Sequence, residues 1–193
     1  VLTILATDPA PDIRAHVACH LATPSATLSV LTAQCVNISD DISLFALTNP
    51  NFPVHELVSL VSTSSPVVLK AILSNPNTPA EILVNHFASR SKRIRERVAA
   101  HPNTPVALLS RYVNDHRIIL EALAGNPNTP PDILIKLAVN VSSFASHTPF
   151  KLVRNPSTPD AALKLLTGCY SVALEVEKVR MFRLQEHVKK YSS

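Results

Sequence analysis

A five-residue turn motif, Asn/His-Pro-Asn-Thr-Pro with small variations, recurs along this chain and constrains its fold more than any other feature. Copies lie at residues 49–53, 75–79, 101–105, 126–130 and 155–159, and a degenerate copy lies at 20–24. The final prolines are spaced by 29, 26, 26, 25 and 29 residues. A regular period of this length is typical of stacked repeats, so we expect a repeat array rather than one folded-over core.

The composition favours helices between these motifs. The chain of 193 residues has sixteen prolines, eleven of them inside the six motifs, and only two glycines. Tight hairpin turns depend on glycine, so a hairpin-rich β structure is disfavoured. Cys19, Cys35 and Cys169 are odd in number and widely spaced, which predicts neither a disulfide framework nor a zinc site. We expect a reducing compartment, the cytoplasm, and no membrane span.

A helix is expected after each motif. A leucine stands four residues beyond the final proline in all six copies, and the next residue of that helical row follows three positions later. Thr78 is expected to be an N-cap, with Pro79 first in the helix and Glu81 completing a capping box. Phe52 replaces the threonine in one copy and should leave that helix start less well capped. These helices are expected over 24–34, 53–62, 79–89, 105–114, 130–140 and 159–169.

A second helix is expected before each motif. Apolar pairs such as Ile94 and Val98 are four residues apart, at a fixed distance before the asparagine or histidine. A residue before proline is pushed out of the helical region, so the asparagine ends the helix, and its side chain can bond nearby backbone groups. These helices are expected over 12–19, 41–48, 66–74, 92–100 and 116–125, with a poorly formed one over 148–154 after an irregular link at 141–150.

Together these elements predict an all-α solenoid, an α-α superhelix of about six two-helix units in one domain over residues 1–193. An amphipathic segment over 172–191, with Val172, Val176 and Phe182 among its apolar residues, should form a helix that caps the open end of the core. The repeats expected from the motif spacing span 8–34, 35–62, 63–89, 90–114, 115–140 and 141–170, and the C-terminal cap spans 171–193.

The string from Ile94 to Leu109, Ile-Arg-Glu-Arg-Val-Ala-Ala-His-Pro-Asn-Thr-Pro-Val-Ala-Leu-Leu, resembles the repeat of the leucine-rich repeat variant family. Ile13-Arg14, with Val17-Ala18 and His20 following, is similar, and the resemblance covers roughly residues 8–170. It implies a right-handed, all-helical superhelix without β-sheet. Some family members carry an N-terminal cysteine-rich iron–sulfur module, but this chain lacks that cysteine cluster, so no cofactor is expected. The longer repeats here favour full second helices, as in HEAT-like arrays.

Charge is distributed unevenly along the chain. Residues 1–69 have a net charge of −4 and residues 70–193 a net charge of +8. The basic residues in the middle of the array form a candidate binding patch: Arg90, Arg93, Arg97, Arg111, Arg117 and Lys136. Positions equivalent to Arg97 in the other repeats are His16, Phe45, Ala71, Ala122 and Lys151, so no continuous basic stripe runs along the array. A solvated helix face accounts for the cluster equally well.

The histidines and cysteines do not predict a catalytic or metal site. His20 and His101 occupy the helix-stop position of asparagine, His86 falls in an apolar row and should pack, and Cys19 and Cys35 should be small buried residues. No His-Glu-x-x-His motif is present, and two glycines cannot build a phosphate-binding loop. We therefore expect no enzyme, no metal and no cofactor.

The function that the sequence favours is a non-enzymatic protein-binding or scaffolding module that presents an extended solenoid surface. Its partner would be a protein, and an acidic one would suit the basic patch. The alternative is a nucleic-acid-binding HEAT-like array that uses the same basic cluster. Tracking a nucleic-acid backbone usually combines a basic stripe with aromatic platforms, and this chain has no tryptophan and three tyrosines.

Overall fold

The structure is a computed structural model that describes residues 1–34, 40–62, 65–140, 147–169 and 171–191. Every regular element in these ranges is a helix, which confirms the all-α prediction. The chain divides into two compact units, Val1–Ser89 and Arg90–Ser193. The division falls between Ser89 and Arg90. It also separates the charge, because unit 1 has two basic and six acidic residues, whereas unit 2 has sixteen basic and eight acidic residues.

The helices alternate between those that end at a turn motif and those that follow one. The pre-turn helices are α2 (Pro11–Cys19), α4 (Asp41–Thr48) and α6 (Pro66–Ile72) in unit 1, and α8 (Lys92–Ala100), α10 (Arg117–Gly125) and α12 (Thr148–Arg154) in unit 2. The post-turn helices are α3 (Ser25–Gln34), α5 (Val54–Val61), α7 (Ala80–His86), α9 (Val106–Arg111), α11 (Pro131–Val139) and α13 (Asp160–Leu166). All twelve lie where the sequence predicts them, with ends that differ by a few residues.

Three elements depart from the expected pattern. A short N-terminal helix, α1 (Leu2–Leu5), was not predicted, and a 3₁₀ turn, η1 (Tyr112–Asn114), continues α9. Helix α12 is fully formed over its seven residues, so the expectation of a poor helix was wrong. Its Pro149 lies in the first turn, where the missing N–H has no intrahelical partner to lose. Most of the irregular link predicted at 141–150 lies outside the described residues.

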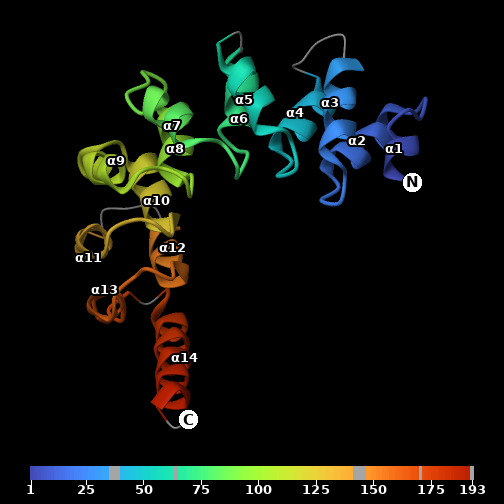
Figure 1. Ribbon diagram of the computed structural model, residues 1–193. Coiled ribbons are helices and arrows are strands. Elements are labelled where there is room, and N and C mark those ends of the chain that lie inside the picture. Colours follow the sequence, from blue (N-terminus) through green and yellow to red (C-terminus); the bar gives the residue numbers. More distant parts are fainter. Residues whose placement is uncertain (35–39, 63–64, 141–146, 170, 192–193) are drawn as a thin grey trace. The chain divides into compact units, whose positions relative to one another are not determined.

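Within each unit the pre-turn helices stack on one another. In unit 1, α4 packs against both α2 and α6; in unit 2, α10 packs against both α8 and α12. Figure 1 shows the same arrangement in unit 2, where α8, α10 and α12 follow one another in one column and α9, α11 and α13 in a second. The helices therefore form two layers, and each layer leaves one side exposed.

The leucine that follows each motif forms the core between these layers. All six are completely buried, which confirms the predicted row: Leu28, Leu57, Leu83, Leu109, Leu134 and Leu163. Burying one leucine side chain contributes roughly 1.5–3 kcal/mol relative to leaving it in water. Three positions further on, Leu31, Tyr112, Leu137 and Leu166 are also buried, whereas Leu60 and His86 are half-buried.

The asparagine of the turn motif has a larger role than ending a helix. Its backbone is extended, as at Asn126 with φ −78° and ψ 122°, which confirms the predicted helix stop. Its Oδ1 accepts a hydrogen bond from the N–H two residues on, at 2.8 Å for Asn128. Its Nδ2 donates to two carbonyls one repeat earlier, those of Ala99 and His101, each at 2.8 Å. One completely buried side chain thus uses both N–H donors and its carbonyl oxygen.

The same bonds recur in both units and form an asparagine ladder. Asn49 donates to Ala18 and His20, Asn75 to Leu47 and Asn49, and Asn155 to Ala124 and Asn126, at 2.7–3.1 Å. Within each unit the ladder fixes each turn on the one before it. Buried amides without partners are costly, so each rung depends on its neighbour being in register.

A second, more exposed row of hydrogen bonds runs beside the ladder. The second asparagine of the motif donates to a carbonyl one repeat earlier, as from Asn77 Nδ2 to Pro50 O at 2.6 Å. Asn51 and Asn128 bond in the same way, and Ser157 does so through its hydroxyl to Pro127 O.

The C-terminal helix α14 (Ala173–Tyr191) ends this row. Val172 and Val176 are buried where the helix packs against α12 and α13, which agrees with the predicted cap. Arg183 Nη1 donates to Thr158 O at 2.7 Å and its Nη2 to Pro156 O at 3.3 Å. The guanidinium therefore bonds the carbonyl that a further repeat would reach. Phe182 lies off the packed row and is exposed.

The threonine before the second proline does not cap a helix, so that prediction was wrong. The N-cap residue of α7 is Pro79, and no side chain caps this helix start. Thr78 instead donates its hydroxyl to Ile72 O, six residues earlier, at 2.5 Å. The same bond is made by Thr23, Thr104, Thr129 and Thr158. The extended backbone before proline turns the side chain back toward the end of the preceding helix. The carbonyl there accepts the N–H three residues on, as Ile72 O does from Asn75, and its second lone pair accepts the hydroxyl.

We predict that Asn126→Ala lowers the free energy of unfolding by about 3 kcal/mol, because the Ala99 carbonyl and the Asn128 N–H lose this partner and the His101 carbonyl keeps only its bond from the Thr104 N–H. Urea titration of the whole chain measures the effect. Asn128→Ser is the matched control, because Ser157 already fills that position in the next turn; its effect should stay within about 0.5 kcal/mol. Equal losses for the two variants would contradict the ladder.

Replacing Thr129 distinguishes its two possible roles. At an N-cap, Thr129→Asp would preserve or raise stability. If the Thr129 hydroxyl instead bonds the Leu123 carbonyl, as observed, Thr129→Asp should lower the free energy of unfolding by about 2 kcal/mol, because a buried carboxylate would face that carbonyl. Thr129→Ser keeps the donor and should cost less. A stabilised Thr129→Asp variant in the same urea titration would restore the capping interpretation.

Candidate functional site

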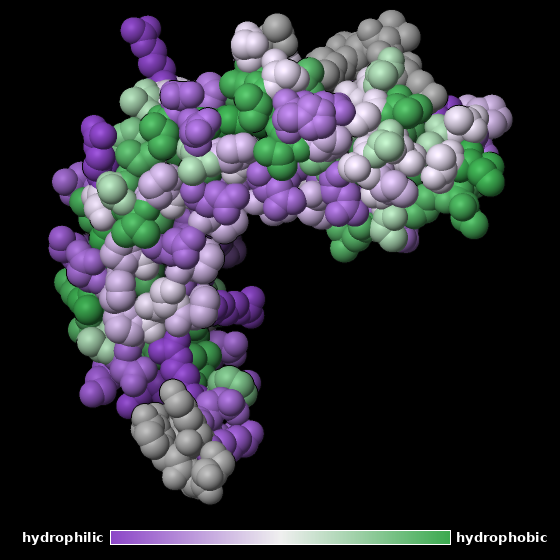
Figure 2. Space-filling model, viewed as in Figure 1, coloured by the Kyte–Doolittle hydropathy of each residue, from purple (hydrophilic) through white to green (hydrophobic). Residues whose placement is uncertain are grey.

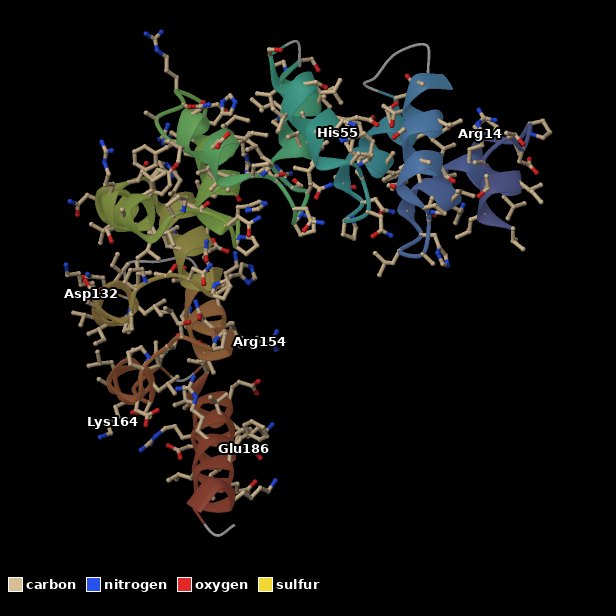
Figure 3. The ribbon with its side chains drawn as sticks, viewed as in Figure 1. Arg14, His55, Asp132, Arg154, Lys164 and Glu186 are labelled. Atoms are coloured by element: carbon tan, nitrogen blue, oxygen red, sulfur yellow. The ribbon has the colours of Figure 1, made fainter. Side chains whose placement is uncertain are left out.

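The six residues of the predicted basic patch are exposed and lie in unit 2, but they are divided between the two layers. Arg93 and Arg97 lie on pre-turn helix α8, Arg90 precedes it, and Arg117 begins α10; Arg111 ends post-turn helix α9, and Lys136 lies on α11. In Figure 3, Asp132 on α11 and Lys164 on α13 lie on the opposite side of unit 2 from Arg154 on α12. The six residues therefore do not share one face.

Arg95, in the middle of the basic cluster, is used within the fold. Its Nε lies 2.9 Å from Asp115 Oδ2 and its Nη2 lies 3.1 Å from Asp115 Oδ1, a bidentate ion pair. The two side chains are about one-fifth exposed. Burial alone would raise the pKa of Asp115, but the hydrogen bonds from Arg95 and the His116 N–H lower the pKa below its ordinary value. The pair holds α8 to the segment before α10, twenty residues away in sequence.

The histidines of the turn motif behave as predicted. His101 Nδ1 accepts from the Asn103 N–H at 3.0 Å, and His20 Nδ1 accepts from the Ala22 N–H at 3.1 Å, in place of asparagine Oδ1. His86 is half-buried, and burial lowers its pKa, so its imidazole is neutral near pH 7, in keeping with the predicted packing role.

The cysteine prediction was wrong for Cys19, which is exposed at the end of α2 rather than buried. Partial burial of its sulfur still raises the pKa of the thiol, which keeps it in the less nucleophilic protonated form. Cys35 lies outside the described residues.

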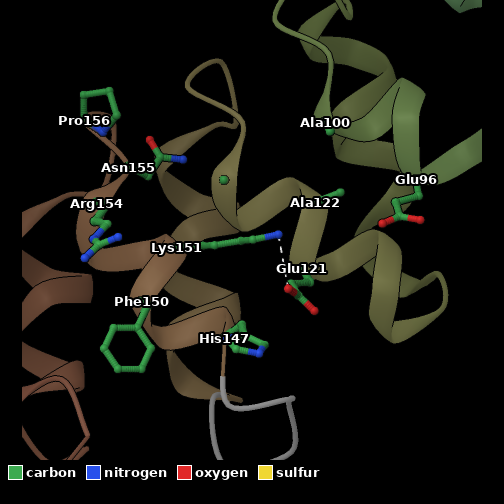
Figure 4. Close-up of a pocket in the computed structure, with 11 residues that line it drawn as sticks. Glu96, Ala100, Glu121, Ala122, His147, Phe150, Lys151, Arg154, Asn155 and Pro156 are labelled. Carbon is green, nitrogen blue, oxygen red and sulfur yellow. Dashed lines mark ion pairs between the residues drawn. The ribbon is translucent and has the colours of Figure 1, made fainter. Parts of the chain in front are cut away.

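A groove lies on the pre-turn layer of unit 2. We call it the pre-turn groove; its volume is about 600 Å³, and it crosses α8, α10 and α12 (Figure 4). Its lining residues are Glu96, Ala100, Glu121, Ala122, Gly125, His147, Phe150, Lys151, Arg154, Asn155 and Pro156. Most of them stand one, four, five or eight residues before the helix-stop asparagine or histidine, so they share one face of the stacked helices.

Small residues form the floor of the groove. Ala100, Ala122 and Gly125 occupy positions where other repeats carry larger side chains, such as Phe45 and Thr48. In the sequence, Ala122 interrupts the row that contains Arg97 and Lys151. In the structure, this absence of bulk leaves space between the side chains of α8 and α12.

Lys151 crosses this floor from α12 to α10. Its Nζ lies 3.1 Å from Glu121 Oε1, the ion pair drawn in Figure 4. A Cβ at Gly125 would stand 3.5 Å from Lys151 Cδ, so the aliphatic stem of the lysine passes directly over the glycine. Lys151 remains 45% exposed and Glu121 is 20% exposed. The ammonium is therefore accessible from the groove while it is paired.

The described residues offer no group of three or more histidine, cysteine or acidic side chains that could hold a metal ion. No helix among them is long and apolar enough to cross a membrane. On the face that Figure 2 shows, hydrophilic residues cover most of unit 2, and apolar residues form small groups among them.

The fold and this surface define an all-α helical-repeat protein with a groove on its pre-turn layer. No protein-family model matches the chain, and no curated protein matches it. Among solved structures, the chain is similar to one titled "A leucine-rich repeat variant with a novel repetitive protein structural motif". The sequences are 18% identical, the match covers 92% of this chain and 70% of that chain, and the TM-score is 0.48. The fold assignment rests on the helices described above.

We predict that Asp115→Asn lowers the free energy of unfolding at pH 7 by about 1–2 kcal/mol, because a charge-assisted bidentate pair is lost. A carboxyl group with a lowered pKa stabilises the folded state above its unfolded pKa, and this contribution is lost as the pH falls through the folded pKa. The difference from the unmodified chain should therefore shrink below about pH 4.

Asp132→Asn is the control for this variant, because Asp132 is exposed on α11 and forms no ion pair with the described residues. Urea titrations at a series of pH values measure both variants. A loss that stays the same from pH 7 to pH 3 would show that the carboxylate charge is not what stabilises the contact.

Proposed function

We propose that this protein is a non-enzymatic protein-binding or scaffolding module and that the pre-turn groove of unit 2 receives its partner. The groove carries the proposal because it is an open space across three stacked helices with a floor of small side chains. Its volume lies in the range of ligand sites, roughly 300–1,000 Å³. Interfaces gain most of their affinity where one side chain fills such a pocket. A segment of a partner protein with one large side chain would fit this description.

The composition of the groove favours binding over catalysis. Its lining contains no hydroxyl or thiol side chain that could act as a nucleophile. The two titratable groups that converge, Lys151 and Glu121, are paired with each other. The cytoplasm is the proposed compartment, because the exposed thiol of Cys19 suits a reducing environment.

Nucleic-acid binding is the competing function, and the arrangement of charge disfavours it. The exposed basic residues are divided between two layers, and Glu96 and Glu121 lie in the groove itself. A chain of phosphates would pass close to both carboxylates. Binding that depends on phosphate contacts also weakens steeply with salt, which gives a separate experimental signature.

Displayed random twelve-residue peptides, selected on the whole chain, test the proposal. The variant Ala100→Trp fills the groove from the exposed end of α8, and we expect it to weaken selected peptides at least about tenfold, or 1.4 kcal/mol. Ala161→Trp is the matched control, because Ala161 is exposed on post-turn helix α13 and does not line the groove. It should leave the affinity unchanged.

Failure to select any peptide, or equal affinity for the Ala100→Trp variant and the unmodified chain, would contradict the groove as a protein-binding site. Fluorescence anisotropy with labelled duplex and single-stranded DNA at low salt provides the second arm. Tight, salt-sensitive DNA binding that is lost on Arg93→Glu and Arg97→Glu would instead support the nucleic-acid function.

A further inference from the structure

The pre-turn groove has one basic side and one acidic side. Helix α12 supplies Lys151 and Arg154, and His147 directly precedes the helix; the three are four and three residues apart and follow one side of it. Helices α8 and α10 supply Glu96 and Glu121. Phe150, about one-third exposed, stands among the basic residues. Lys151 extends from the basic side across the floor of small residues to Glu121.

Both carboxylates of the acidic side already have a cation. Arg93 Nη1 lies 3.1 Å from Glu96 Oε2, and Lys151 Nζ lies 3.1 Å from Glu121 Oε1. Arg154 is exposed and forms no ion pair with the described residues, and the same holds for His147. The charge that remains available to a ligand is therefore positive and lies on α12.

We propose, on the basis of the protein-binding function proposed above, that the groove selects an acidic segment in which a carboxylate adjoins a large apolar side chain. Lys151 and Arg154 bind the acidic groups of the segment, while the apolar side chain lies on Ala100 and Ala122 beside the Lys151 ammonium. Lys151 extends toward Glu121 and Arg154 lies at the other side of the same lining, so an acidic segment that crosses the groove meets both cations (Figure 4). Lysine has three donors, and its pair with Glu121 leaves others open.

Glu121 acts within this site as an internal competitor for Lys151. A ligand carboxylate that reaches the ammonium also approaches the Glu121 carboxylate, and like charges at short range repel in a partly buried site. The stem of Lys151 lies over Gly125 and keeps the ammonium close to Glu121. Glu121 thus sets how strongly acidic a segment must be to bind.

Removing the Glu121 charge should change the affinity in opposite directions for an acidic and a basic ligand. Removing the Glu121 charge strengthens the binding of an acidic segment, because the competitor is gone and Lys151 is released. It weakens the binding of a basic segment, which would depend on Glu121 itself. Loss of the Arg154 charge has the opposite effect on each ligand. The two substitutions together therefore identify the charge of the partner.

The probes are two displayed twelve-residue libraries with fixed centres, Glu-Phe and Lys-Phe, selected on the whole chain. We expect enrichment of the Glu-Phe library. For the strongest clone, made as a labelled peptide, Glu121→Gln should raise the affinity about three- to tenfold, and Arg154→Gln and Lys151→Gln should lower it about tenfold. Replacing the central Glu by Gln, or Phe by Ala, in the peptide should each abolish most of the binding.

Glu186→Gln is the control for Glu121→Gln, since Glu186 is exposed on α14 outside the groove and should have no effect. Thermal unfolding checks that each variant is folded, and Lys151→Arg, which keeps the charge, should retain most of the affinity if Lys151→Gln is unstable. Enrichment of the Lys-Phe library, or weaker binding on Glu121→Gln, overturns the inference. Peptides that Ala100→Trp blocks but that contain no acidic residue leave the protein-binding function intact and refute only the acidic ligand.

Discussion

The rest of the structure depends on the buried asparagine amide of the turn motif. In each described rung, one side chain accepts a hydrogen bond from its own turn and donates two to the turn before it. An amide in a site without water is costly if any of these bonds is missing, so the spacing between successive turns is fixed closely. Hydrophobic packing alone tolerates small displacements, whereas these bonds do not. The ladder therefore sets the register of the helices that end in it.

That register determines what lines the surface of unit 2. Because α8, α10 and α12 end at equivalent points of the ladder, residues at the same distance before each turn lie side by side. A small residue in one repeat then opens a space beside the longer side chains of the next. The pre-turn groove arises in this way at Ala122 and Gly125, between Glu96 on one side and Lys151 on the other. Differences between repeats, rather than the repeated motif, give this surface its chemistry.

Much of the fold could be predicted because its determinants are local in sequence. Proline fixes the backbone before and after each turn, and the leucine four residues later is completely buried in every copy. The role of Thr78 could not be predicted, because an N-cap and a bond to the preceding helix use the same residue type. The direction of its hydroxyl is decided by the path of the chain through the turn. Arg95 illustrates a second limit, since its partner Asp115 lies twenty residues away without any pattern that links them.

In the candidate site, too, some features follow from the sequence and others only from the tertiary structure. The sequence by itself determined the repeat, the alternation of helices, the core leucines and the excess of positive charge in unit 2, since each follows from residue type and spacing. Only the tertiary structure decided that the asparagine reaches back one repeat, that the predicted basic residues are divided between two layers, and that Lys151 meets Glu121 across Gly125. These contacts join residues some 25–31 positions apart. Such contacts depend on how successive repeats stack, and no single repeat specifies that geometry.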